Sequence, residues 1–169
     1  MEHTLTAAML SAASISLLSF VGCGGGEVTP GAAATVGDVA IYDAYAPASP
    51  LNDVGSLYFT IVNRGDAEDT LTAVTIPAGR AQLHEVVTVD DVTRMRPLTL
   101  LPIPAHGVLK LAPGGYHVML SHLGTRLAVG DSLEVKLTLS SAGTIAFKAA
   151  VLTYSEVVRR VEESVPRDP

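Results

Sequence analysis

Two histidines and two methionines stand at spacings that could hold one metal ion. They are His84, Met95, His117 and Met119, separated by ten residues, twenty-one residues and one residue. Thioether sulfur is a soft neutral ligand and imidazole is a borderline one, so the set suits Cu(I) far better than Zn(II), Ca(II) or Mg(II). The set contains no thiolate, so we expect binding to be reversible. Only the two histidines compete with protons for the metal, so the site should weaken only when they protonate.

Two of these ligands are expected on one strand. Side chains alternate between the two faces of a strand, which places His117 and Met119 on the same face. Tyr116, Val118 and Leu120 then point to the opposite face, where they can enter a core.

The other two ligands are expected on a β-hairpin. Two β-prone runs flank the pair Asp90-Asp91. If that pair forms the loop, Val86 stands opposite Met95, and His84 becomes the diagonal neighbour of Met95 on the same face, roughly 7–8 Å away at the backbone. A four-residue loop would keep this register, whereas a three-residue loop would turn one ligand to the wrong face.

Each of the four residues has a plainer interpretation when taken alone. A single methionine in a strand is more often part of a core, and a single histidine is more often a surface residue. Four such residues on shared faces favour a metal site. His106 lies in a turn and His122 has the opposite strand parity to His117, so neither is included. Glu85 points away from the ligand face.

Several sequence segments resemble those of a known family. They are Asp43-Ala44-Tyr45-Ala46, Ala81-Gln82-Leu83-His84-Glu85, Met95-Arg96-Pro97 and Leu111-Ala112-Pro113-Gly114-Gly115-Tyr116-His117-Val118-Met119-Leu120. With the ligand spacing, they resemble the His-x10-Met-x21-His-x-Met pattern of the periplasmic copper chaperones usually called PCu(A)C. The resemblance extends over about Val36 to Leu152. One position departs from it, because many relatives carry a further methionine where this chain has Val86.

The resemblance implies a fold and a function. The family has a cupredoxin-like Greek-key β-barrel and binds Cu(I) through the residues that correspond here to His84, Met95, His117 and Met119. It implies a copper-accepting partner, with the binuclear copper centre of cytochrome c oxidase as the recipient.

Turn signals and short apolar runs independently predict a single all-β domain, a sandwich or barrel, over residues 36–153. The expected strands are Asp38–Tyr45, Ser56–Asn63, Thr70–Ile76, Gln82–Val89, Val92–Leu98, Gly107–Leu111, Tyr116–Leu120, Ser132–Leu139 and Thr144–Val151. A tail, 154–169, carries Val157, Val158 and Val161 at near-helical spacing, which favours a frayed helix over disorder.

The N-terminal segment predicts export. Residues 1–22 form an apolar signal peptide that ends just before Cys23, and residues 23–35 read as a flexible tether rich in Gly and Ala. Cys23 is the sole cysteine and is the expected lipidated residue, which would anchor the protein at the periplasmic face of a bacterial membrane. An ordinary signal peptide, giving a soluble periplasmic protein, and an N-terminal anchor remain open alternatives.

Composition narrows the function classes. The net charge of −6, with no basic run, disfavours nucleic-acid binding. No catalytic motif is present, and a blue-copper centre would need a thiolate, so we do not expect an enzyme. Three classes remain: a copper carrier with a recipient, a copper-buffering or resistance lipoprotein without one, and a surface module that binds no metal.

Overall fold

Alternation of side chains decides which residues enter the core. In the strand β10 (Ser132–Leu139), Val135, Leu137 and Leu139 are buried, whereas Glu134 and Lys136 are exposed. The same period of two recurs in β11, and it gives these two strands one face toward the core and one toward solvent.

The computed structural model describes residues 32–77 and 79–164, in which eleven strands are followed by one helix. The elements are β1 (Ala34–Val36), β2 (Val39–Pro47), β3 (Val54–Asn63), β4 (Asp69–Thr75), β5 (Arg80–Val89), β6 (Val92–Leu98), β7 (Leu101–Ile103), β8 (Gly107–Leu111), β9 (Tyr116–Ser121), β10, β11 (Gly143–Leu152) and α1 (Tyr154–Glu163).

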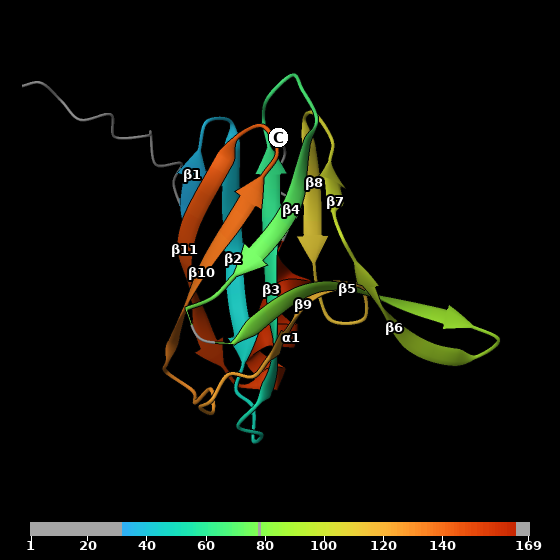
Figure 1. The fold of residues 1–169 in the computed structure, drawn as a ribbon, viewed down its shortest axis with the longest axis vertical. Helices are drawn as coiled ribbons and strands as arrows, with labels where there is room; N and C mark the ends of the chain where they lie inside the picture. Colours follow the sequence, from blue (N-terminus) through green and yellow to red (C-terminus); the bar gives the residue numbers. More distant parts are fainter. Residues whose placement is uncertain (1–31, 78, 165–169) are drawn as a thin grey trace, which may run out of the picture.

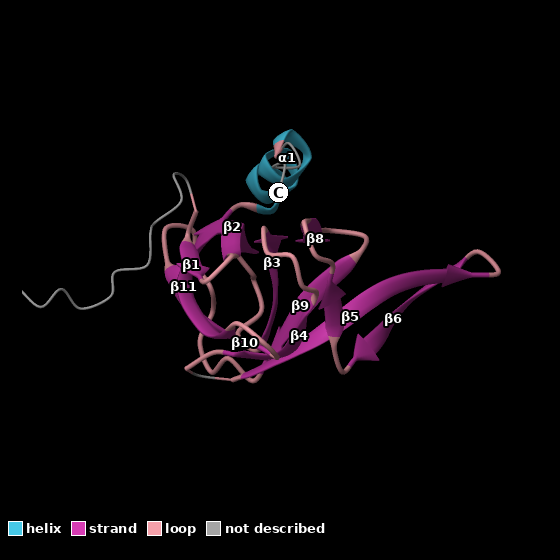
Figure 2. Ribbon diagram, turned by 90° about the horizontal axis from the view of Figure 1, so that it is seen from above, coloured by secondary structure: helices cyan, strands magenta, loops and turns pink. Residues whose placement is uncertain are grey.

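The strands form one continuous sheet in the order β6-β5-β9-β3-β2-β11-β10-β4-β7, with β1 on β2 and β8 on β3. All pairs are antiparallel except β2 with β11, which run parallel. Seen from above, the sheet curls around its interior as a barrel, and the β5–β6 hairpin projects from one side (Figure 2). Figure 1 shows the same hairpin extending well beyond the body of the barrel.

The barrel interior is filled by one large apolar cluster. At its centre Phe59 of β3 meets Phe147 of β11 edge-on, with ring centroids 5.7 Å apart. Val118 and Leu120 are fully buried in this cluster, and Tyr116 packs partly against it. The predicted inward face of the strand that carries His117 and Met119 is therefore confirmed.

A buried carboxylate ties β4 to the turn between β10 and β11. Asp69 accepts hydrogen bonds from the backbone N–H groups of Thr70, Ser141 and Ala142 and from the Ser140 hydroxyl, at 2.7–2.9 Å. Burial alone would raise the pKa of Asp69, but these four donors favour the charged form and lower it.

The helix α1 lies outside the barrel, against the outer face of β2 and β3 (Figure 2). It begins after Thr153, whose hydroxyl accepts a hydrogen bond from the Glu156 N–H at 3.2 Å. Val157 and Val161 are buried against Tyr58 of β3. The predicted tail helix is present, but it is docked on the barrel rather than frayed, because its valines share one face over an apolar patch.

All nine predicted strands form, and the predicted all-β class is confirmed. Two short strands, β1 and β7, were not predicted. The tether prediction is wrong at its end, because Ala34–Val36 pairs with β2. The signal peptide and Cys23 lie outside the described residues. Within the described part of the chain, no helix is long and apolar enough to cross a membrane.

Candidate metal site

The two histidines meet across the ladder between β5 and β9. His84 of β5 is paired directly with His117 of β9, and their ring centroids lie 5.8 Å apart. Directly opposed residues of an antiparallel pair share a face, so both rings project from the same side of the sheet. Two imidazoles at this separation can turn toward one ion between them.

Strand register places both methionines on the same face as the histidines. Met119 follows His117 by two residues on β9, and Met95 of β6 is paired with Val86, which follows His84 by two residues on β5. The predicted hairpin register is confirmed. The structure adds the pairing of β5 with β9, which brings the two halves of the predicted ligand set together.

The hairpin loop is as short as predicted. Val89 pairs with Val92, and the two loop residues Asp90 and Asp91 have φ of 50° and 60°. Positive φ at both central residues matches a type I′ turn, whose twist suits a two-residue hairpin. The turn thereby fixes the register on which the position of Met95 depends.

The start of β5 is held close to the end of β9 by a glycine. Gly79 has φ of 102°, and a Cβ there would lie 2.7 Å from the Ser121 carbonyl oxygen. Only glycine allows this approach without displacing the backbone.

His84 is a buried polar side chain without a partner. It is 9% exposed, and both of its ring nitrogens lack a hydrogen-bond partner. Burial, with a smaller contribution from the nearby His117, lowers the pKa of His84 and so favours the neutral ring. A neutral buried imidazole with free nitrogens is the form that a metal ion requires.

His117 is oriented by its own strand. Its Nδ1 lies 3.1 Å from the Gly115 carbonyl oxygen. A carbonyl can only accept a hydrogen bond, so this contact favours the tautomer in which Nδ1 carries the proton and Nε2 has the lone pair. This is the arrangement in which a second partner fixes the tautomer of a ligating histidine.

Met95, His117 and Met119 line one groove at the surface. Its other walls are the segment 47–50, the first residues of β3 and Tyr154 at the start of α1. Met95 is 63% exposed, so one side of the site opens to solvent. Among the twelve lining residues none is Asp, Glu, Lys or Arg.

Three neighbouring residues, His106, His122 and Glu85, were left out of the predicted ligand set, and the strand β9 ends at Ser121, just before His122. His106 is exposed and hydrogen bonds to Asp66 at 2.9 Å, in the turn where it was expected. His122 contacts Ser121 and does not line the groove. Glu85 forms an ion pair with Arg96 at 2.6 Å on the face opposite to the ligands.

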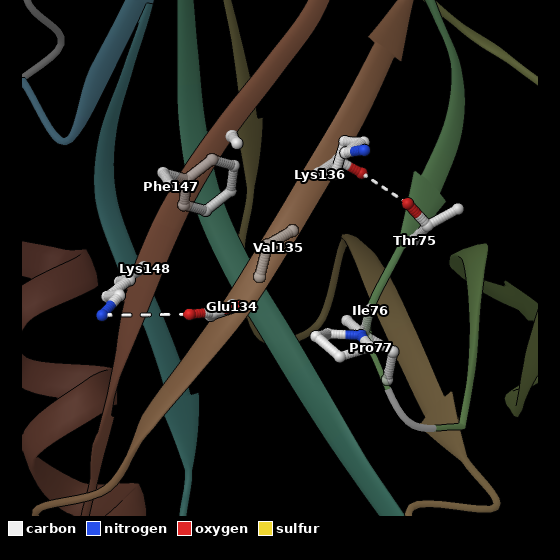
Figure 3. Close-up of a pocket in the computed structure, with 9 residues that line it drawn as sticks. Thr75, Ile76, Pro77, Glu134, Val135, Lys136, Phe147 and Lys148 are labelled. Carbon is white, nitrogen blue, oxygen red and sulfur yellow. Dashed lines mark hydrogen bonds and ion pairs between the residues drawn. The ribbon is translucent and has the colours of Figure 1, made fainter.

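A site built from carboxylates is not available in the described residues, where no three His, Cys, Asp or Glu side chains cluster. Figure 3 shows a second hollow, between β10 and the segment that leaves β4. There Lys148 lies 3.9 Å from Glu134, and the Thr75 hydroxyl donates to the Lys136 carbonyl. This hollow contains neither His nor Met, so the groove is the better metal site.

Ser56, Tyr58 and Tyr154 also line the groove, and sequence analysis missed them. Ser56 is paired with Met119 across β3 and β9. The signal was the alternation of hydroxyl-bearing residues along β3, which becomes meaningful only when the pairing of β3 with β9 is known.

Comparison with known proteins shows the family of this chain. The family model described as "Putative lipoprotein LpqE-like" matches residues 39–151. The chain belongs to this family. A curated relative of this LpqE-like chain, "Putative lipoprotein Lxx21020" of Leifsonia xyli subsp. xyli, is 29% identical over 160 residues, which cover 90% of this chain and 95% of the relative.

Two solved structures resemble the LpqE-like domain. The copper-bound PCuAC domain from PmoF2 is 27% identical with a TM-score of 0.59, and the match covers 70% of this chain and 96% of that one. The apo PCuAC domain from PmoF1 is 30% identical with a TM-score of 0.58, covering 70% and 97%. The resemblance to the PCu(A)C family drawn from the sequence is confirmed, and with it the cupredoxin-like fold.

Proposed function

We propose that this LpqE-like protein is an extracytoplasmic copper carrier that binds one Cu(I) through His84, Met95, His117 and Met119. The observation that carries the proposal is the pair of buried, directly opposed histidines, one of which has no hydrogen-bond partner at either nitrogen. Buried polar atoms are almost always satisfied in folded proteins, so such a ring calls for an explanation. A metal ion supplies it.

The ligand chemistry supports copper in its reduced state. The two sulfurs are neutral and soft, which favours Cu(I) over harder divalent ions. The relative named as a copper-bound PCuAC domain supports the same metal. Copper is therefore the cargo of the protein.

The exposure of Met95 favours a carrier over a store. A ligand that is 63% exposed can be displaced by an incoming ligand of another protein without opening the barrel. We propose that a copper-accepting protein receives the ion at this open side, and that the recipient is the binuclear copper centre of cytochrome c oxidase. A lipid on Cys23 would hold the carrier at the periplasmic face of the membrane.

Metal titration tests the binding. The apo protein is titrated with Cu(I) and separately with Zn(II) under reducing conditions. We expect one Cu(I) per chain and weaker or no binding of Zn(II). Replacement of His106, an exposed histidine outside the groove, should leave the stoichiometry unchanged. Tighter binding of Zn(II), or no binding of Cu(I), would contradict the proposal.

A deletion strain grown at limiting copper tests the delivery. Loss of cytochrome oxidase activity that returns with added copper supports a carrier with this recipient. Normal oxidase activity together with increased sensitivity to excess copper would support the buffering alternative instead.

A further inference from the structure

The C-terminal helix contributes one wall of the groove that three of the four proposed ligands line; His84 is not among the lining residues. Tyr154, the first residue of α1, lines this groove together with Met95, His117 and Met119. Tyr154 comes from a segment far from these residues in the sequence, so its presence depends on where the helix docks.

The position of the helix is fixed at both of its ends. Near the N-terminus the Thr153 hydroxyl caps the first turn, and Val157 is fully buried. Near the C-terminus the Lys110 Nζ donates to the Val161 carbonyl oxygen at 2.6 Å, and the Arg160 guanidinium lies 5.5 Å from the centre of the Tyr45 ring. The ring of Tyr154 is therefore carried by an anchored element.

Hydroxyl-bearing residues of β3 also line the groove, next to the proposed ligand Met119. Ser56 is paired with Met119, and Tyr58 follows it by two residues on the same face of β3. Burial raises the pKa of the Tyr58 phenol, a hydrogen bond with Ser56 opposes this, and the nearby Tyr154 adds to the rise. Both Tyr58 and Tyr154 line the groove.

Tyr154 is 60% exposed, and an exposed tyrosine at the start of a helix does not by itself indicate a function. The residues around Tyr154 are the reason to consider one. None of the described lining residues is Asp, Glu, Lys or Arg, and both Met95 and Tyr154 are largely exposed, so water or a chelator can reach this part of the groove.

We propose that Tyr154 is a positioning residue that covers the open side of the copper site and slows the loss of the ion. The inference rests on the proposed function. The face of an aromatic ring attracts a cation within about 6 Å, and the ring excludes water from the ligands it covers. Both effects belong to the ring and do not require its hydroxyl group.

The test is the rate at which the copper-loaded full chain, purified in detergent, gives up Cu(I) to excess bathocuproine disulfonate. We expect Tyr154→Ala to increase this rate about tenfold, in line with a cation–π contribution at a partly desolvated site. Tyr154→Phe should keep the original rate. Leu100→Ala removes an exposed apolar side chain outside the groove and serves as the matched control.

A spectroscopic readout separates this role from a merely structural one. The chain contains no Trp and five Tyr, so tyrosine fluorescence can be recorded directly. Cu(I) binding should change the fluorescence of the original chain, and much of this change should be lost in Tyr154→Phe. Circular dichroism of the apo variants verifies that each is folded.

The outcomes are distinct. If the original chain binds no Cu(I), the proposed function fails. If it binds Cu(I) and both Tyr154→Ala and Leu100→Ala release it at the original rate, the role of Tyr154 is overturned while the copper site stands. If Tyr154→Phe releases copper as fast as Tyr154→Ala, the covering ring is overturned in favour of the hydroxyl group.

Discussion

His84 and His117 are directly opposed on neighbouring strands, yet only His117 has a hydrogen-bond partner for its ring. The difference has a geometric cause. The Gly115 carbonyl lies two residues before His117 on its own chain, whereas no polar group reaches the buried ring of His84. One ring is therefore oriented in advance, and the other is held only by packing.

Met95→Leu should weaken Cu(I) binding strongly and leave the apo fold almost unchanged. Leucine has a similar volume but offers no sulfur, and a substitution at an exposed site usually changes the free energy of unfolding by no more than about 0.5 kcal/mol. The measurement is the melting temperature with and without Cu(I), since the shift reflects affinity for the folded state. If Cu(I) raises the melting temperature of both proteins equally, Met95 is not a copper ligand.

His84→Leu should abolish copper binding without destabilising the apo protein. The ring forms no hydrogen bond, so its replacement by an apolar side chain removes an unsatisfied buried group and is expected to stabilise the fold by about 1–3 kcal/mol. Urea denaturation of both apo proteins at pH 7 measures the change. Replacement of the exposed His122 provides the control. Marked destabilisation by His84→Leu would indicate a structural role for this ring.

Asp69→Asn should destabilise the protein in a pH-dependent manner. The charged carboxylate accepts four hydrogen bonds, and their loss or weakening should cost about 1–3 kcal/mol at pH 7. Because the folded pKa is lowered, the unfolded state takes up a proton first as the pH falls. The stabilisation is therefore complete above the unfolded pKa of about 4 and disappears as the pH falls through the folded pKa.

Urea denaturation over a pH series checks this sign. The difference in free energy of unfolding between the original protein and Asp69→Asn should become smaller as the pH falls from 5. Glu134→Gln, at an exposed site, should differ from the original protein by almost nothing at any pH. If the difference for Asp69→Asn does not change with pH, the charge of the carboxylate is not what stabilises the fold.

Cys23→Ser should release the protein from the membrane fraction or block its processing. The motive is the position of the sole cysteine directly after the apolar N-terminal run. Fractionation of cells and the apparent mass of the product give the answer. A mutant that is processed and fractionates like the original would favour an ordinary signal peptide or an N-terminal anchor.

Much of the site could be predicted because its information is local. The shared face of His117 and Met119 follows from strand alternation, and the register of Met95 follows from a two-residue turn. The pairing of His84 with His117 could not be predicted from local patterns. The strands β5 and β9 that bring them together are separated in the sequence by β6, β7 and β8. Non-local pairing depends on which strands the whole core brings together.

The helix shows the same limit. Its existence was indicated by the spacing of its valines, but its docking on Tyr58 depends on β3, far away in the sequence. The position of Tyr154 in the groove could not be predicted for that reason. Short strands such as β1 and β7 were missed because three residues are too few to show alternation.

The parallel pairing of β2 with β11 also sets the order in which the molecule can fold. This pairing joins the strands β6-β5-β9-β3-β2 to the strands β11-β10-β4-β7, so the two halves of the sheet cannot join until nearly the whole polypeptide is available. Such non-local contacts slow folding, whereas the β5–β6 hairpin can form early from neighbouring residues. The helix that carries Tyr154 follows β11 directly. The strands β5, β6 and β9, which carry the proposed ligands, can therefore assemble before Tyr154 takes its place in the groove.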